Sequence, residues 1–260
     1  MKIITYNVNG IRASLKKGLL GFIEKEAPDI LALQEIKSQI GQIPPDFLTS
    51  LKKLGYLSYF NPSSLKVGHS GTAIITKIKP NKVSFEIGLK EFDKAGRIIR
   101  CDFDNFTLFN FYMVNGKRNE ADLSLKLKSY NWLSKELSSF ENKRSSAPFI
   151  LVGDFNIAHR EIDLARPKEN KNKIGFTLKE REKIDTLLEG GLLDSFRHFN
   201  KEGSNYTWWS HFANSRERNI GWRIDYCFIS KALKPNLKKA FILPKIMGSD
   251  HCPTGIEINV

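Results

Sequence analysis

The sequence predicts an α/β fold of the mixed, α+β kind in a single domain covering residues 1–260. Strand-like apolar runs alternate with segments of helical periodicity along the whole chain. The strand-like runs between residues 71 and 113 have no helix between them, so antiparallel pairs are expected and a purely parallel barrel is not. No repeat, low-complexity tract or linker divides the sequence, and its length suits one large domain.

The predicted elements follow in chain order. Strands are expected where short apolar runs are bounded by turn residues, at 2–8, 30–34, 71–76, 97–103, 106–113, 149–153, 224–230 and 255–260. Helices are expected where apolar residues recur every three or four positions, at 15–25, 45–54, 120–137 and 177–188. The last helix begins with a capping box formed by Thr177 and Glu180, and Gly190 ends it.

The composition favours a polyanionic partner inside the cell. Lys and Arg number 41 against 28 acidic residues, a formal charge of +13, although a well-solvated lysine-rich surface would give the same balance. Charge alone leaves DNA, RNA and an acidic membrane surface open. The 3 cysteines are scattered, which fits a reducing compartment. Because no signal peptide and no apolar run of about 20 residues is present, we expect a cytoplasmic protein without membrane spans.

Several apolar runs end in side chains that bind metals or handle protons. Asn7, Glu35, Asp154 and Asp225 all follow or end such runs, and the pair Asp250-His251 lies in a turn between Gly248 and Pro253. Polar groups gathered at strand ends are how α/β enzymes build active sites. The pattern therefore predicts one site assembled from distant parts of the chain.

Asp154 and Asn156 are separated by one residue directly after an apolar run. On an extended backbone their side chains would share one face and Phe155 would point to the core. The alternative is an Asx turn at the end of a strand.

Glu35 follows the apolar run 30–34, and a carboxylate there is costly to bury unless it is paired or binds a cation. Carboxylate and amide oxygens are typical magnesium ligands, whereas an exposed strand end is the alternative. The sequence has no dense Cys/His cluster, so a zinc site is not expected. His251 becomes informative only with a carboxylate partner, which would favour its charged form beside a phosphate.

These segments resemble, in the same order along the chain, the exonuclease III family of apurinic/apyrimidinic endonucleases, within the wider endonuclease/exonuclease/phosphatase superfamily. The resemblance lies in residues 6–12, 33–37, 153–159, 175–177, 221–226 and 248–253. It implies a four-layered α/β sandwich, with two mixed β-sheets packed face to face and flanked by helices. It also implies Mg²⁺-dependent hydrolysis of the phosphodiester 5′ to an abasic site in double-stranded DNA, with Mn²⁺ as a substitute metal. Exonuclease (3′→5′), 3′-phosphodiesterase or 3′-phosphatase activity on blocked 3′ ends is implied as well, in a monomer.

The resemblance also implies roles for individual residues. The metal ligand is Glu35, with Asn7 and Asp250 near the metal. The catalytic group comprises Asp154 at the attacking water, Asn156 and His251 clamping the phosphate, Asp225 orienting His251, and Tyr112 bonding the phosphate or assisting proton transfer. The pocket for the base-less sugar is lined by Trp208, Trp222 and Ile224, and phosphates beside the lesion are contacted by Asn115, Lys117, Arg118 and Asn170.

The sequence departs from the family pattern in places. Val114 stands where proline is common, Trp208 where phenylalanine is common, and Asn9 where one branch carries aspartate. Two other functions remain open: a superfamily phosphoesterase acting on inositol phosphates or phospholipids, and a non-catalytic DNA-binding module. The second predicts a degraded site, yet all the polar positions are filled.

Overall fold

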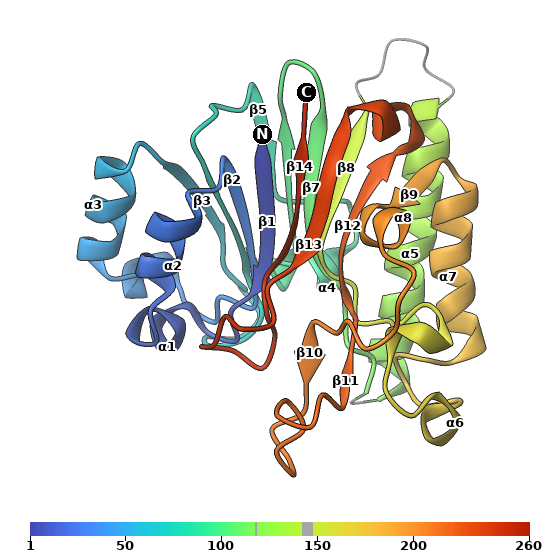
Figure 1. The fold of residues 1–260 in the computed structure, drawn as a ribbon. Helices are drawn as coiled ribbons and strands as arrows, with labels where there is room; N and C mark the ends of the chain where they lie inside the picture. Colours follow the sequence, from blue (N-terminus) through green and yellow to red (C-terminus); the bar gives the residue numbers. More distant parts are fainter. Residues whose placement is uncertain (118, 142–147) are drawn as a thin grey trace.

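The computed structural model describes residues 1–117, 119–141 and 148–260. Two six-stranded sheets pack face to face, and helices cover their outer faces (Figure 1). The first sheet has the order β13 (Leu237–Ile242), β14 (Thr254–Ile258), β1 (Lys2–Asn7), β2 (Ile30–Gln34), β4 (Thr72–Thr76), β3 (Leu57–Asn61). The second has the order β5 (Lys82–Ser84), β6 (Ile98–Asp102), β7 (Thr107–Tyr112), β8 (Phe149–Asp154), β12 (Asp225–Ser230), β9 (Leu192–Asp194).

Short helices flank the first sheet and longer ones the second. On the left in Figure 1 lie α1 (Ile11–Lys16), α2 (Leu19–Glu26) and α3 (Pro45–Lys53), and on the right lie α5 (Glu120–Glu141) and α7 (Leu178–Glu189). The remaining elements are α4 (Lys90–Lys94), α6 (Pro167–Asn170), α8 (Ser195–Phe199), the two-stranded sheet of β10 (Trp208–Trp209) and β11 (Gly221–Trp222), and 3₁₀ turns at Ile40–Gln42, Glu161–Asp163 and Lys231–Asn236. The predicted four-layered sandwich is confirmed.

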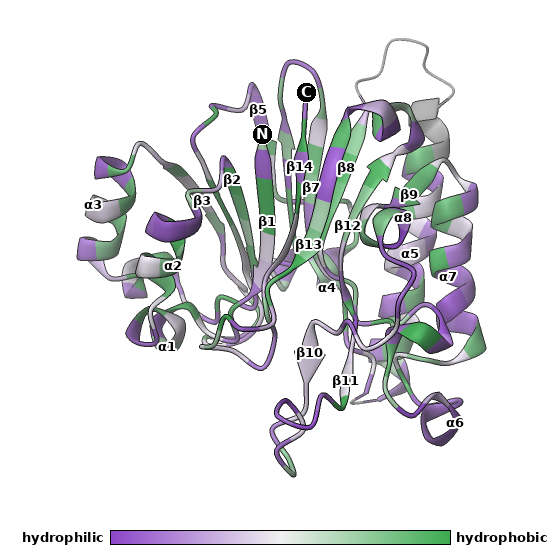
Figure 2. Ribbon diagram, in the orientation of Figure 1, coloured by the Kyte–Doolittle hydropathy of each residue, from purple (hydrophilic) through white to green (hydrophobic). Residues whose placement is uncertain are grey.

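Each six-stranded sheet is mixed, with one parallel pair at its centre. The pair β1–β2 is parallel in the first sheet and β7–β8 in the second, whereas their other neighbours run antiparallel. The inner faces of the two sheets share a core to which Ile3, Ala32, Leu108 and Val152 contribute. Figure 2 shows these inner strands as the most hydrophobic part of the ribbon, with hydrophilic residues on the outer surfaces of the helices.

The predicted helix 15–25 was wrong in its extent. The chain instead forms α1 and α2, which are separated at Gly18, whose φ of +98° is left-handed. A glycine adopts this conformation without the steric cost that another residue would bear, so it ends one helix and starts the next. None of the helices in the described ranges is both long enough and apolar enough to cross a membrane.

The close approach of β7 to β8 requires a glycine at position 153, directly before Asp154. Gly153 pairs with Phe111 on the parallel strand β7, and a Cβ at this position would lie 1.9 Å from the Phe111 carbonyl oxygen. Only glycine permits this approach. The glycine thereby sets how β8 delivers Asp154 to the edge of the sheet.

Candidate active site

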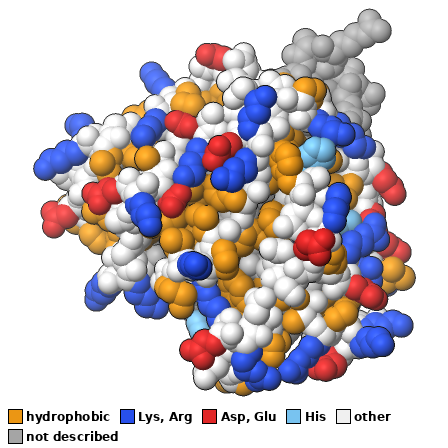
Figure 3. Space-filling model, viewed as in Figure 1, with side chains coloured by type: hydrophobic (Ala, Val, Ile, Leu, Met, Phe, Trp, Pro, Cys, Tyr) orange, Lys and Arg blue, Asp and Glu red, His pale blue; other side chains and the backbone are white. Residues whose placement is uncertain are grey.

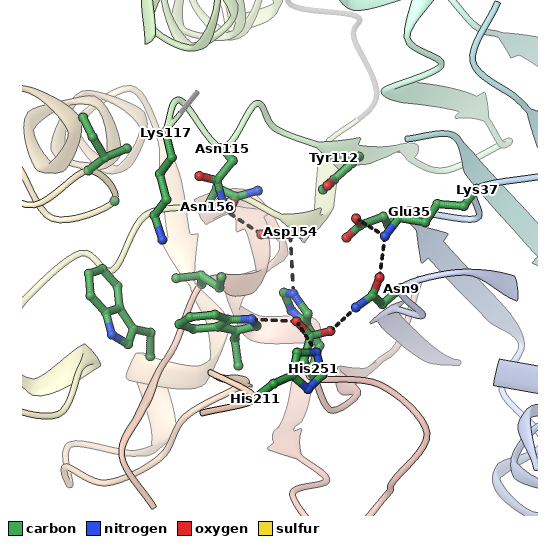
Figure 4. Close-up of a pocket in the computed structure, with 16 residues that line it drawn as sticks. Asn9, Glu35, Lys37, Tyr112, Asn115, Lys117, Asp154, Asn156, His211 and His251 are labelled. Carbon is green, nitrogen blue, oxygen red and sulfur yellow. Dashed lines mark hydrogen bonds and ion pairs between the residues drawn. The ribbon is translucent and has the colours of Figure 1, made fainter. Parts of the chain in front are cut away.

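The candidate active site lies where both parallel pairs end. The carboxyl ends of parallel strands meet at one edge of a sheet, and β1 and β2 pack across from β7 and β8. The strand ends at Asn7, Tyr112 and Asp154 therefore converge. They open onto a pocket of about 290 Å³ lined by Asn9, Glu35, Lys37, Tyr112, Asn115, Lys117, Asp154, Asn156, Ile174, Gly175, Trp208, His211, Trp222, Ile224, Asp250 and His251 (Figure 4).

Four pocket residues leave their strands through a left-handed backbone. Asn9, Glu35, Lys37 and Asn156 have φ values of +45°, +57°, +50° and +54°. Such conformations cost free energy in non-glycine residues and concentrate at functional sites. Here they turn polar side chains at the strand ends toward the pocket.

The Asp154–Asn156 segment is an Asx turn and not an extended strand end. The Asn156 N–H donates to Asp154 Oδ1 at 2.9 Å, and Asn156 has a left-handed φ. The prediction that two extended residues share a face was therefore wrong in its geometry, although both side chains line the pocket. Phe155 is fully buried among the core residues of the second sheet, as predicted.

Asn7 bridges the two carboxylates that come from different sheets. Its Nδ2 donates to Glu35 Oε2 at 3.1 Å and to Asp154 Oδ2 at 2.9 Å, while its Oδ1 accepts the Asn9 N–H at 3.0 Å. Because the amide nitrogen faces the two carboxylates, the amide oxygen is turned away from a metal that they would bind. The structure thus places Asn7 as a link behind the pocket, in an orientation that does not suit a metal ligand.

A chain of contacts crosses the pocket from Glu35 to Trp208 (Figure 4). The Lys37 ammonium lies 2.9 Å from Glu35 Oε1 and donates to Asn9 Oδ1 at 2.5 Å. Asn9 Nδ2 donates to Asp250 Oδ1 at 2.8 Å, and Trp208 Nε1 donates to Asp250 Oδ2 at 3.0 Å. Burial raises the pKa of Asp250, but the His251 charge and these two donors outweigh it and lower the pKa overall.

His251 and Asp225 form a buried pair. His251 Nδ1 lies 2.8 Å from Asp225 Oδ2, and its Nε2 lies 3.9 Å from Asp154 Oδ2. Burial lowers the pKa of His251, but Asp225, Asp154 and Asp250 outweigh it and raise the pKa to about 10. The imidazole is therefore a cation at neutral pH, and Nδ1 is the nitrogen that donates to Asp225.

Asp154 and Tyr112 differ in how readily they exchange a proton at neutral pH. Burial and the Asp225 charge raise the pKa of Asp154 to about 7, against the lowering effect of His251. Burial and the Glu35 carboxylate hold the pKa of Tyr112 well above its usual value. At neutral pH Asp154 can therefore accept a proton, whereas the Tyr112 phenol keeps its own and acts as a hydrogen-bond donor.

The donor set suits a hard cation. Ligand atoms of Asp154, Asp225 and His251 lie within 4.8 Å of one another, and Asp225 Oδ1 is buried without a hydrogen-bond donor among the described residues. A protonated imidazole cannot ligate a metal, so the carboxylate oxygens are the useful donors. Glu35 and Asp250 add carboxylates that open onto the pocket.

Two indoles form the apolar wall of the pocket. Trp208 and Trp222 meet edge to face with centroids 6.4 Å apart, and Ile224 packs in the same cluster. The Lys117 ammonium lies 5.5 Å and 6.0 Å from the two ring centroids. Figure 3 shows that basic side chains are otherwise spread over the visible face among acidic ones, and do not form a single patch there.

The structure brings most of the predicted site residues together. Those that line the pocket are Glu35, Tyr112, Asn115, Lys117, Asp154, Asn156, Trp208, Trp222, Ile224, Asp250 and His251, while Asn7 and Asp225 lie directly behind them. Asn170, the last residue of α6, is not among the lining residues. Its amide donates to the backbone carbonyl oxygens of Ala165 and Arg166, which directly precede α6. Arg118 lies outside the described residues.

Sequence reasoning assigned no role to the lining residues Lys37, Ile174, Gly175 and His211, and it named Asn9 only as a departure from the family pattern. Asn9 and Lys37 each lie two positions beyond an assigned residue, Asn7 and Glu35, and this repeated spacing was the available signal. His211 follows the predicted wall residue Trp208 by three positions, a weaker signal.

The chain is similar throughout its length to known nucleases. A profile of the Endonuclease/Exonuclease/phosphatase family matches residues 4–251. A DNA-(apurinic or apyrimidinic site) endonuclease of Dictyostelium discoideum is 42% identical over 264 residues, covering 100% of this chain and 71% of that protein. An exodeoxyribonuclease of Bacillus subtilis (strain 168) is 41% identical over 263 residues, covering 100% of both.

A solved structure gives the same fold. The 3′ phosphatase NExo from Neisseria, bound to a product DNA hairpin, superposes with a TM-score of 0.89 at 28% identity and covers 100% of both chains. With the profile matching nearly the whole chain and relatives above 40% identity, this chain belongs to the Endonuclease/Exonuclease/phosphatase family.

Proposed function

We propose that this protein is a metal-dependent nuclease that hydrolyses the phosphodiester 5′ to an abasic site in double-stranded DNA. The observation that carries the proposal is the pairing of Asp154, whose pKa is about 7, with the cationic His251 at 3.9 Å in a pocket walled by indoles. The names of the relatives, an abasic-site endonuclease and an exodeoxyribonuclease, support the same substrate.

In this mechanism Asp154 accepts a proton from the attacking water. A general base works best with a pKa near the operating pH, which the Asp154 carboxylate meets at about 7. The water oxygen forms a bond to phosphorus as the bond to the 3′ oxygen breaks, which leaves a 3′ hydroxyl and a 5′ phosphate on the base-less sugar. Tyr112 is the alternative base, but its raised pKa makes it a donor to the phosphate.

His251 and Asn156 stabilise the charge that develops on the phosphate. The imidazolium is held by Asp225 through Nδ1, so its Nε2–H is available to a phosphate oxygen. The Asn156 amide is fixed because its Oδ1 accepts from Asn115 at 2.9 Å and its Nδ2 donates to the Met113 carbonyl at 2.9 Å. One N–H of that amide group remains for the phosphate.

The metal is Mg²⁺, with Mn²⁺ as a substitute, and Glu35 is its main ligand. Carboxylate oxygens at the pocket mouth suit these hard ions, and Asp250 is the second carboxylate in reach of the pocket. When bound, the metal supplies Lewis-acid polarisation and neutralises the leaving 3′ oxygen. Asn7 contributes by orienting Glu35 and not by ligation.

Selectivity for the abasic sugar comes from the size of the pocket. A volume of about 290 Å³ lies just below the usual range for ligand pockets, about 300–1,000 Å³. We expect an extruded deoxyribose to pack beside Trp208 and Trp222, and the two indoles to exclude a sugar that carries a base. The same site can also bind the 3′ end of a strand and remove a blocking group from it. A structural neighbour is named a 3′ phosphatase, which supports this second activity.

We further propose that the chain acts as a single-domain monomer in the cytoplasm. The two sheets share one core, which supports a single domain. Cys101, Cys227 and Cys252 are free and buried, which suits a reducing compartment.

The test is a duplex with one tetrahydrofuran abasic analogue, incubated with Mg²⁺ and separately with a chelator. We expect incision 5′ to the analogue with Mg²⁺ and none with the chelator, and slower loss of a 3′ phosphate from a nicked duplex. An intact duplex with hydrolysis of a phosphoinositide instead would favour the phosphoesterase alternative. Binding without any hydrolysis would favour the DNA-binding module.

A further inference from the structure

A buried ion pair lies behind one wall of the pocket. Lys126 on α5 and Glu180 on α7 are both fully buried, and Lys126 Nζ lies 2.5 Å from Glu180 Oε1. Burial lowers the pKa of Lys126, and the Glu180 carboxylate opposes that effect. A buried ion pair adds little net stability compared with apolar side chains of the same size, so its presence calls for another explanation.

Lys126 holds the backbone of two pocket residues. Its ammonium also donates to the carbonyl oxygens of Asn115 at 3.2 Å and Asn156 at 2.9 Å. With Glu180 as the third acceptor, all three N–H groups of the ammonium are used. The loops after β7 and β8, which carry Asn115 and Asn156, are thereby bound to one point.

Glu180 holds a third loop of the pocket. Its Oε2 accepts from the Gly175 N–H at 2.8 Å, the Thr177 N–H at 3.2 Å and the Thr177 hydroxyl at 2.7 Å. Gly175 lines the pocket, and a Cβ there would lie 3.2 Å from the Trp222 ring and 3.3 Å from the Asn156 carbonyl oxygen. The position of this loop against Trp222 therefore sets the width of the pocket on that side.

We propose that the Lys126–Glu180 pair is a positioning device that fixes the wall formed by Asn115, Asn156 and Gly175 against Trp222, and so determines how strictly the pocket excludes a sugar that carries a base. The selectivity part rests on the proposed function. The clamping of the three loops does not, because it follows from the hydrogen bonds of the pair alone.

The informative variant replaces both partners. Lys126→Met alone leaves a buried carboxylate unpaired, which costs about 3–5 kcal/mol and can prevent folding. Lys126→Met combined with Glu180→Leu removes both charges at similar volume, so no buried charge is left unpaired. It also removes the hydrogen-bond partners of the Asn115 and Asn156 carbonyl oxygens and of the Gly175 N–H, which is the loss that the proposal tests. The control is Lys2→Met with Glu26→Leu, which removes a partly exposed pair at 2.6 Å between β1 and α2, away from the pocket.

Two measurements decide the proposal. The first is the ratio of kcat/KM for incision at the abasic analogue to kcat/KM for nicking of an intact duplex. The second is amide hydrogen exchange in peptides covering 113–117, 154–158 and 173–177. For the double variant at wild-type Tm, we expect the ratio to fall at least about tenfold and exchange in the last two peptides to rise about tenfold or more. The control should change neither.

The opposite results are clear. The proposal is overturned if the double variant keeps the wild-type Tm, the wild-type amide exchange rates and the wild-type kcat/KM ratio. The pair would then have no positioning role. If the double variant does not fold, Glu180→Gln keeps the side-chain shape and is judged by the same two measurements. If the wild type does not incise abasic DNA, the proposed function fails, and the exchange data still decide whether the pair clamps the loops.

Discussion

Replacing Asp225 by Asn should move the whole pH profile of incision toward acid. In our mechanism Asp154 has to be unprotonated, so kcat/KM rises as the pH passes its pKa of about 7. His251 has to be protonated, so kcat/KM falls as the pH passes about 10. The Asp225 charge raises the pKa of both groups, and its removal lowers both.

The size of each shift follows from the distances. At an effective dielectric constant of about 20, unit charges separated by the 2.8 Å between Asp225 Oδ2 and His251 Nδ1 interact by about 6 kcal/mol, or about four pKa units, as an upper limit. Asp154 and Asp225 have oxygens no more than 4.8 Å apart, and at that distance the interaction at the same dielectric constant is about 3.5 kcal/mol. We expect the alkaline limb to move down by about two units or more and the acid limb by about one.

The assay is single-turnover incision of the tetrahydrofuran duplex, which resists alkaline strand cleavage, from acid pH to beyond the His251 pKa of about 10. Asp185→Asn is the matched control, because Asp185 bonds His159 at the same 2.8 Å outside the pocket. An acid limb that stays in place in Asp225→Asn would mean that Asp154 is not the titrating base. An unmoved alkaline limb would refute the role of His251.

Further variants test the other assignments. Asp154→Asn should lower kcat about 10²–10⁴-fold with DNA affinity unchanged by fluorescence anisotropy, and full incision would contradict our mechanism. Glu35→Gln should weaken Mg²⁺ or Mn²⁺ binding at least tenfold in calorimetry without DNA, whereas unchanged binding would assign the metal to other carboxylates. Trp208→Phe keeps a ring in the wall but loses the N–H donated to Asp250, so kcat/KM should fall about fivefold, for about 1 kcal/mol; no change would make that hydrogen bond dispensable. Lys117→Met should reduce the slope of log affinity against log salt by about 0.9, and an unchanged slope would remove Lys117 from the phosphate contacts.

The inner strands could be predicted from the sequence and the edge strands could not. Each strand-like run identified in the sequence became an inner strand, whereas β13, β3, β5 and β9 form the edges of the two sheets and were missed. Inner strands are buried on both faces, so their sequences are continuous apolar runs. The edge strands lack such runs: β13 carries the exposed Lys238 and Lys239, and β5 and β9 have only three residues each, so no local pattern distinguishes them from loops.

The predicted site residues were found for a related reason. Strand ends are visible in the sequence, so the residues that follow them could be assigned to one edge. The contacts between them could not be predicted, because they depend on left-handed turns at Asn9, Lys37 and Asn156. Asn170 lies at the end of α6, outside the pocket lining, where its amide bonds the backbone of Ala165 and Arg166; its contact with a DNA phosphate stays a prediction. The Lys126–Glu180 pair joins two helices far apart in the chain; the capping box marks Glu180 as a helix start, but no local signal connects it with Lys126.

The reacting groups are divided between the two sheets, which meet through their shared core and through hydrogen bonds such as those of Asn7 and Asn110. Glu35 follows β2 of the first sheet, while Asp154 and Asp225 belong to β8 and β12 of the second. A newly synthesised chain with one sheet formed and the other still loose carries no complete set of these groups. We therefore expect cleavage of DNA to begin only after the two sheets have docked, because neither sheet alone holds all of these groups.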